Sequence, residues 1–166
     1  MKAKISFITY FESPIGKVQL GFNSNYALTT AQFVQDGLAQ PGQNAFGVEE
    51  IEMALIQLAE YFDGRRTQFE LKLSPNGTEF QKKVWNQLMS IPFGKTQTYQ
   101  EVANQLGDPK VIRAAAAANG KNPISIIIPC HRVIGSDNSL IGYAGGLHRK
   151  KWLLEHENPV KQGKLF

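Results

Sequence analysis

The sequence predicts an α+β protein of two domains: an antiparallel sheet with one helix in the first half, and a mainly helical second half. Three short β-prone runs separated by turn residues open the chain, which is typical of an antiparallel meander. Apolar residues then recur at helical spacing, and further helical segments follow. In order, these segments are 4–11, 15–22, 26–34, 48–62 and the region from Thr78 onward.

The boundary between the two halves is marked by the turn Ser74-Pro75-Asn76-Gly77, which precedes Thr78, an N-cap candidate for the next helix. Apolar residues after Thr78 form one helical stripe that ends at Ile91-Pro92-Phe93-Gly94. The predicted parts are a structural domain over 1–73, a catalytic domain over 74–160 and a tail over 161–166.

Composition limits what the chain can be. Its 166 residues are 42% apolar, enough to bury a core, and they include one cysteine, Cys130. A single cysteine excludes an internal disulfide framework and a cysteine-based zinc site. The N-terminus has no apolar core of signal-peptide length, and no run approaches a membrane span of roughly 20 apolar residues. We therefore expect a soluble, cytoplasmic protein.

Charge is distributed unevenly along the chain, whose overall net charge is +4. Residues 1–72 carry six Lys and Arg against eight Asp and Glu, whereas residues 73–166 carry twelve against six. Basic surface is often only solvated surface. A basic half that also contains a reactive residue nevertheless favours a polyanionic substrate, with nucleic acid as the first candidate.

A helix-turn-helix is predicted within the second half. Thr98 can cap a helix over Tyr99–Leu106, with Glu101 completing a capping box, and Gly107-Asp108-Pro109 forces a tight turn before a helix over Lys110–Asn119. The second helix contains five consecutive alanines, which cannot read base edges in the major groove. Small residues beside one long cation, Arg113, suit minor-groove binding and base displacement. The alternative is a packed helix rich in its best helix former.

Cys130 follows Ser125–Ile128, which the apolar run predicts to be a buried strand ended by Pro129. A thiol beside His131 is a candidate nucleophile, although a free cysteine is more often an inert core residue. Glycines at 142, 145 and 146 allow a ligand to approach the backbone closely. A last helix is predicted over Leu147–Glu157, with Trp152 and Leu153 facing inward. Glu157 at its C-terminus opposes the helix dipole, so it needs a partner if it is buried.

Several of these motifs together resemble the O6-alkylguanine-DNA alkyltransferases, and the resemblance is continuous over residues 78–157. The motifs are Asn122-Pro123, Pro129-Cys130-His131-Arg132-Val133, Tyr143-Ala144-Gly145-Gly146, Trp152-Leu153-Leu154 and His156-Glu157. The resemblance implies a ribonuclease H-like N-terminal α/β domain and a winged-helix DNA-binding domain that grips the minor groove and flips the damaged nucleotide. It also implies irreversible alkyl transfer from O6-methylguanine in duplex DNA, and it leaves open O4-methylthymine as a second substrate.

Carried over by position, Cys130 would accept the alkyl group, His131 would draw off the thiol proton through a bound water, and Glu157 would orient His131. An unperturbed thiol of pKa about 8.5 is mostly protonated at neutral pH and needs such help. The resulting S-alkyl cysteine cannot be regenerated, so the chain would turn over once. No cofactor and no metal are expected, and a monomer acting on double-stranded DNA is implied.

The resemblance also implies contact residues. Tyr99 would crowd the phosphate behind the flipped nucleotide, Arg113 would fill the gap in the base stack, and Asn122 would brace the cysteine segment. The expected DNA-binding residues are Tyr99, Arg113, Ala114, Ala117 and Asn119; the expected pocket residues are Asn122, Pro129, Val133, Tyr143, Ala144, Gly145 and Gly146. Two departures are evident: Ala144 stands where some members have Ser, and the zinc ligands of some N-terminal domains are missing.

Three other functions fit parts of this pattern. A non-catalytic relative that binds alkylated DNA would lack the acceptor cysteine, whereas Cys130 is present. A cysteine hydrolase would need an oxyanion hole and a base separated in sequence from its nucleophile, and would not need a helix-turn-helix. A transcription regulator is compatible with the helix pair, but the alanine run cannot supply sequence readout.

Overall fold

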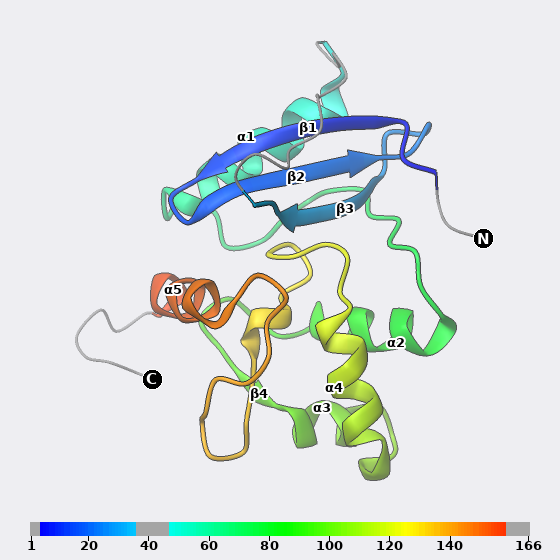
Figure 1. Ribbon diagram of the computed structural model, residues 1–166, viewed down its shortest axis with the longest axis vertical. Coiled ribbons are helices and arrows are strands. Elements are labelled where there is room, and N and C mark those ends of the chain that lie inside the picture. The colour runs from blue at the N-terminus through cyan, green and yellow to red at the C-terminus, as the bar shows by residue number, and fades with distance from the viewer. Residues whose placement is uncertain (1–3, 36–46, 159–166) are drawn as a thin grey trace. The chain divides into compact units, whose positions relative to one another are not determined.

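The chain folds into two compact units, residues 1–76 and 77–166, in a computed structural model that describes residues 4–35 and 47–158 (Figure 1). The predicted tail over 161–166 lies outside the described residues. No helix in the described part of the chain is long and apolar enough to cross a membrane.

The first unit contains the predicted meander. Its strands are β1 (Phe7–Ser13), β2 (Gly16–Phe22) and β3 (Leu28–Phe33), which form one antiparallel sheet in the order β1-β2-β3. The β1–β2 hairpin closes with Ser13 opposite Gly16, and Gly16 takes a φ of 129° that favours glycine at this turn. The predicted strands are therefore confirmed, with boundaries shifted by a few residues.

Helix α1 (Glu49–Phe62) supplies the apolar face that the sheet needs in order to bury its own. Its buried side chains recur three and four residues apart, as the sequence pattern predicts. The residues that form this core are Val18, Leu20, Phe22, Leu28 and Ala31 from the sheet, and Ile51, Ala54, Leu58 and Tyr61 from α1. Gly64 follows α1 with a φ of 79°, so the predicted stop signal lies where the helix ends.

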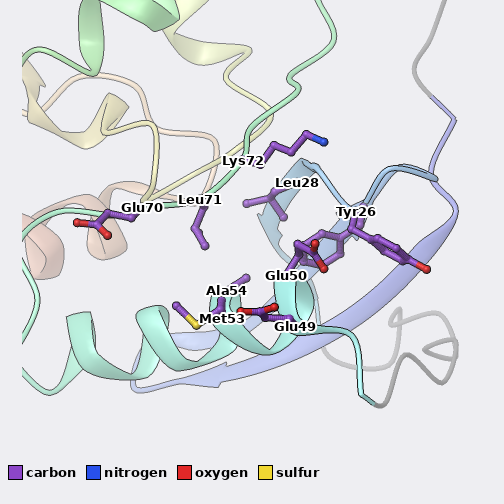
Figure 2. A pocket seen from close by; sticks show the side chains of 10 residues that line it. Tyr26, Leu28, Glu49, Glu50, Met53, Ala54, Glu70, Leu71 and Lys72 are labelled. Atoms are coloured by element: carbon purple, nitrogen blue, oxygen red, sulfur yellow. The ribbon is translucent and has the colours of Figure 1, made fainter.

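A pocket of about 270 Å³ opens in this first unit, between the start of α1 and the segment 70–72 (Figure 2). Its apolar lining includes Phe22, Leu28 and Met53, and exposed carboxylates of Glu49 and Glu70 belong to its rim. None of the residues predicted for the functional site lines it.

The second unit is built from helices α2 (Glu79–Leu88), α3 (Tyr99–Gln105), α4 (Ile112–Gly120) and α5 (Leu147–Glu157) (Figure 1). Two short strands, β4 (Gln97–Thr98) and β5 (Val133–Ile134), pair in parallel. Helices α2 and α4 are joined by the indole of Trp85, whose Nε1 donates to the carbonyl of Ala118 at 2.8 Å.

Capping residues start two of these helices where the sequence predicts. Thr78 and Gln81 form a capping box at α2, and Thr98 and Glu101 form another at α3. The predicted helix over Lys110–Asn119 begins differently, with a 3-10 turn η1 (Pro109–Val111) before α4. Asp108 caps this turn, because its carboxylate accepts from the Lys110 amide at 2.9 Å.

The predicted strand over Ser125–Ile128 is wrong, because this segment folds into buried turns. Ile126 has a φ of 74°, which no strand residue adopts, and the amide of Ile128 donates back to the carbonyl of Ile124 at 3.0 Å. The Asn122 side chain makes hydrogen bonds to backbone groups that a neighbouring strand would otherwise satisfy. Its Nδ2 donates to the Ile128 carbonyl at 2.8 Å, and its Oδ1 accepts from the Ile124 amide at 3.0 Å. A short apolar run indicates burial but does not distinguish a strand from such a turn.

Candidate active site

Cys130 opens the 3-10 turn η2 (Cys130–Arg132), directly after the Asn122-braced segment. Its residue is 4% exposed, and its amide donates to the Ile128 carbonyl at 2.8 Å. Burial raises the pKa of the Cys130 thiol, while a hydrogen bond with Asn122 and the charge of Lys150 act in the opposite direction. The thiol is therefore held in place but needs assistance to lose its proton.

His131 and Glu157 meet at the core of the second unit, although 26 residues separate them in sequence. The imidazole Nε2 lies 2.8 Å from Glu157 Oε2, and both residues are buried. Because the carboxylate accepts, Nε2 carries a proton, and Nδ1 is the ring nitrogen that remains for another partner. Nδ1 is buried and has no hydrogen-bond partner among the described residues. The partner that Glu157 needs on burial is thus present.

A residue that sequence reasoning missed, Arg132, completes this cluster. Its Nε donates to Glu157 Oε1 at 2.8 Å and its Nη2 to Glu157 Oε2 at 3.0 Å, so the guanidinium binds the carboxylate with two nitrogens. Burial by itself raises the pKa of Glu157, but the charges and hydrogen bonds of His131 and Arg132 outweigh it and hold that pKa well below its usual range. Glu157 is therefore ionised at neutral pH.

A second missed residue is Lys150, which is buried although it is a lysine. Its Nζ donates to the carbonyls of Ile141 at 2.9 Å and Gly142 at 3.3 Å. Burial lowers the pKa of Lys150 to about 8, and the nearby Cys130 acts to raise it. The helical spacing was the available signal, since Lys150, Leu153, Leu154 and Glu157 follow the i, i+3, i+4, i+7 pattern of one inward face.

The rest of α5 corrects one expectation. Leu153 faces the core as predicted, but Trp152 is only half-buried and stacks on His156, with ring centroids 4.9 Å apart. The inward face therefore runs through Leu153 and Leu154, one residue away from the predicted position of Trp152.

The predicted substrate pocket draws on the segment 141–146. The Tyr99 hydroxyl donates to the Ile141 carbonyl at 2.9 Å, and Lys150 Nζ lies 5.8 Å from the centre of the Tyr99 ring. Burial raises the pKa of Tyr143 well above its ordinary value, and Cys130 adds to this effect. Pro129 and Val133 are buried on either side of η2, whereas Gly145 and Gly146 are half-buried and Ala144 is exposed.

The residues predicted to contact DNA divide between the two faces of α4. Arg113, Ala114 and Ala117 are exposed, whereas Ala115 and Ala118 are buried. The buried face fits the interpretation of a packed helix, whereas DNA contact by the exposed face stays a prediction. Asn119 does not share the exposed face, because it is 5% exposed. Tyr99 lies half-buried at the first position of α3.

In the described residues, no group of three or more His, Cys, Asp and Glu side chains is arranged to hold a metal ion. The groups that the site brings together are the thiol of Cys130, the imidazole of His131 and the buried charges of Arg132, Lys150 and Glu157.

Comparison with known proteins shows which family combines these features. The family described as 6-O-methylguanine DNA methyltransferase, DNA binding domain, matches residues 79–159. A methylated-DNA–protein-cysteine methyltransferase of Methanosarcina acetivorans is 44% identical over 153 residues, covering 91% of this chain and 97% of the relative. One from Mycobacterium leprae is 46% identical over 148 residues, covering 88% of each chain.

Solved structures agree in fold. The crystal structure of Mycobacterium tuberculosis O6-methylguanine methyltransferase aligns with a TM-score of 0.80 at 41% identity, covering 90% of this chain and 91% of that one. A structure of Mycobacterium tuberculosis OGT in complex with DNA aligns with a TM-score of 0.79 at 41% identity, covering 91% and 94%. The mixed α/β fold with its small antiparallel sheet is thus shared over nearly the whole length. On these grounds the chain belongs to the methylated-DNA–protein-cysteine methyltransferase family.

Proposed function

We propose that this chain repairs alkylated DNA by direct reversal, taking the alkyl group of O6-methylguanine onto Cys130. The observation that carries this proposal is the buried pair of Cys130 and His131, in which Glu157 holds Nε2 of the imidazole and leaves Nδ1 available. Family membership supplies the substrate class: the related chains are named for transfer from methylated DNA to a protein cysteine.

The reaction is a displacement at carbon. The proton of the Cys130 thiol passes to Nδ1 of His131, through a water molecule, and the thiolate attacks the alkyl carbon. The S–C bond forms as the C–O6 bond breaks, and the guanine leaves with the electron pair of that bond. A thioether has no acidic proton and is a poor leaving group, so Cys130 stays alkylated and each molecule acts once.

Delivery of the base is assigned to the second unit. We assign α3, the turn with η1, and α4 to the predicted helix-turn-helix of a winged-helix DNA-binding domain. The exposed face of α4, with Arg113, Ala114 and Ala117, suits close approach to a minor groove because it carries small side chains and one long cation. Arg113 would occupy the stack after the nucleotide is flipped, and Tyr99 would contact the adjacent phosphate.

The guanine would bind between η2 and the segment 143–146. In this arrangement the Val133 carbonyl accepts from the exocyclic amine, and the backbone near Gly145 and Gly146 faces the base edge. Ala144 offers no hydroxyl to O6, so backbone amides have to supply that contact. O4-methylthymine, which presents a similar alkylated oxygen, is a possible second substrate within the same proposal.

The remaining assignments complete the proposal. The first unit is a ribonuclease H-like structural domain, the chain acts as a monomer on duplex DNA, and a single cysteine used as a thiol suits the reducing cytoplasm. The predicted boundary near residue 74 falls close to the division between residues 76 and 77.

Intact-mass measurement after incubation with duplex DNA carrying O6-methylguanine tests this function. A gain of one methyl group, mapped to Cys130 and stopping at one per molecule, is the expected result. Cys130→Ala should gain no mass while it still binds the duplex, because removing the sulfur removes the acceptor and leaves α3 and α4 intact. Methyl transfer to the Cys130→Ala protein contradicts the assignment of the acceptor. Lesion binding without any mass gain by the unmodified chain leaves a damage-recognition protein instead.

A further inference from the structure

One buried carboxylate in this molecule serves two cationic partners. Glu157 accepts from His131 Nε2 and from two nitrogens of Arg132, and the three residues are 2%, 0% and 6% exposed. The mechanism above uses the His131 contact and leaves Arg132 without a role.

The third nitrogen of the guanidinium fixes its orientation. Arg132 Nη1 donates to the carbonyl of Ile91, just after α2, at 2.7 Å, and the Phe93 ring centre lies 5.9 Å from the guanidinium carbon. The two parallel contacts to Glu157 therefore cannot be exchanged for others by a rotation of the side chain. A planar fork held in this way is a property that arginine has and lysine lacks.

The charges of Glu157 and Arg132 have opposite effects on the protonation of His131. A buried carboxylate with a histidine as its sole partner would attract a proton to that histidine, because burial leaves its charge otherwise uncompensated. An imidazolium carries protons on both nitrogens and cannot accept another one from a thiol. With Arg132 bound to both oxygens, the carboxylate is already neutralised, and the positive guanidinium opposes a second positive charge on His131.

We propose that Arg132 is a positioning residue that keeps His131 neutral, with its proton on Nε2, so that Nδ1 is ready to receive the proton of Cys130. The proposal rests on the proposed alkyl transfer and assigns a part of its chemistry to a residue that touches neither the substrate nor the thiol.

Other titratable groups around this cluster do not replace Arg132. From η2 itself the thiol of Cys130 adjoins the imidazole in sequence, and from the segment 141–146 the phenol of Tyr143 interacts with both Cys130 and Glu157. From α5, Arg149 interacts with Tyr143 and donates to the Gly145 carbonyl at 2.9 Å, and Lys150 bonds to the Ile141 and Gly142 carbonyls. In the described part of the chain, Glu157 forms ion pairs with His131 and with Arg132.

The pH dependence of methyl transfer tests the proposal. In Arg132→Met the pH at which the rate is half-maximal on the acid side should rise by about one unit, because His131 is then protonated until higher pH. At pH values below the new midpoint this variant should be about tenfold slower than the unmodified chain, which follows from one unit of pH. Arg132→Lys, which keeps the charge without the fork, should restore the midpoint.

A matched control exists in the first unit. Arg66 donates through Nε and Nη2 to Glu60 Oε1 at 3.3 and 3.2 Å and through Nη1 to the Gln68 carbonyl at 2.8 Å, so it also joins a carboxylate to a backbone carbonyl, although it contacts one carboxylate oxygen where Arg132 contacts two. Arg66→Met should leave the midpoint unchanged. A purely structural role for Arg132 would lower the plateau rate or the thermal stability of Arg132→Met without moving its midpoint, and that outcome overturns the proposal.

Removing one partner of a buried ion pair can prevent folding, so a second comparison avoids the uncompensated charge. Glu157→Gln retains Arg132 beside His131, and Glu157→Gln with Arg132→Met removes both charges. The double variant should have the higher acid-side midpoint, because the repulsion by Arg132 is gone; equal midpoints overturn the proposal. NMR titration of the His131 ring in the same proteins, without DNA, shows which variant has the higher midpoint, independently of activity. If the unmodified chain transfers no methyl group at any pH, the proposed function fails, while the NMR comparison still decides the role of Arg132.

Discussion

At the scale of single residues, the site contains charged side chains that are buried, although burial disfavours the charged form. Lys150 is buried against two backbone carbonyls and lies near Cys130, whose thiolate is favoured by a neighbouring positive charge. A buried lysine is costly to a fold unless its charge is used. Its position indicates two uses: it fastens the segment 141–142, and it assists ionisation of the thiol.

Lys150→Met should therefore slow methyl transfer at neutral pH, by roughly tenfold if the pKa of Cys130 rises by about one unit. The loss should diminish as pH increases, because hydroxide then removes the proton without help from Lys150. The measurement is the rate of mass gain from pH 6 to 9. Lys151→Met is the matched control, since Lys151 is the exposed neighbour on the same helix. An equal loss at every pH would leave Lys150 only its role of fastening the segment.

At the scale of elements, local signals account for what the sequence could predict. The capping boxes at Thr78 and Thr98 are each formed by residues three positions apart, so the starts of α2 and α3 can be predicted from a short stretch of sequence. The segment Ser125–Ile128 was misjudged because its form depends on the Asn122 side chain and on a positive φ at Ile126. Four consecutive β-branched or small residues do not reveal either feature.

Asn122→Ala should destabilise the protein by about 1–3 kcal/mol, because it leaves the buried amide of Ile124 without this partner and removes one of the two donors to the buried Ile128 carbonyl. Urea unfolding measures this change. Methyl transfer should fall as well, since Ile128 accepts from the amide of Cys130. Asn104→Ala, at an exposed position of α3, serves as control and should alter stability by less than about 0.5 kcal/mol. Unchanged stability of Asn122→Ala would show that the turn forms without this brace.

At the scale of the whole molecule, the distribution of charge predicts how the chain meets DNA. The basic excess belongs to residues 73–166, which also contain α3 and α4. Contacts with phosphates displace condensed cations, so affinity falls as salt rises, with a slope of about −0.9 per contact on a double logarithmic plot.

Affinity for a lesion-bearing duplex should therefore fall steadily between about 50 and 200 mM salt, because phosphate contacts make affinity strongly dependent on salt in this range. Fluorescence anisotropy measures it. Lys110→Ala, at the turn before α4, should reduce the slope by roughly one. Lys17→Ala should leave the slope unchanged, because Lys17 pairs with Glu12 in the sheet of the first unit. An affinity independent of salt would contradict the use of the basic half for DNA binding.

The site itself shows what a sequence can and cannot disclose. Cys130 and His131 are adjacent, so their pairing was visible, and family resemblance pointed to Glu157. The contacts of Arg132 with Ile91 and Glu157 span 41 and 25 residues, and that of Tyr99 with Ile141 spans 42. Such contacts depend on how helices pack, which periodicity within one helix does not specify. Arg132 was missed for this reason, whereas Lys150 could have been found from the helical spacing of the inward face of α5.

The burial of the one thiol has a practical consequence. A bulky thiol-specific dye cannot reach a sulfur that belongs to a residue only 4% exposed, and the chain has no other cysteine to react with it. Dye incorporation in the absence of DNA therefore counts transient openings of the second unit, and its rate reports their free energy. Until it is alkylated, the sulfur of Cys130 is therefore a probe of the conformational fluctuations of the second unit.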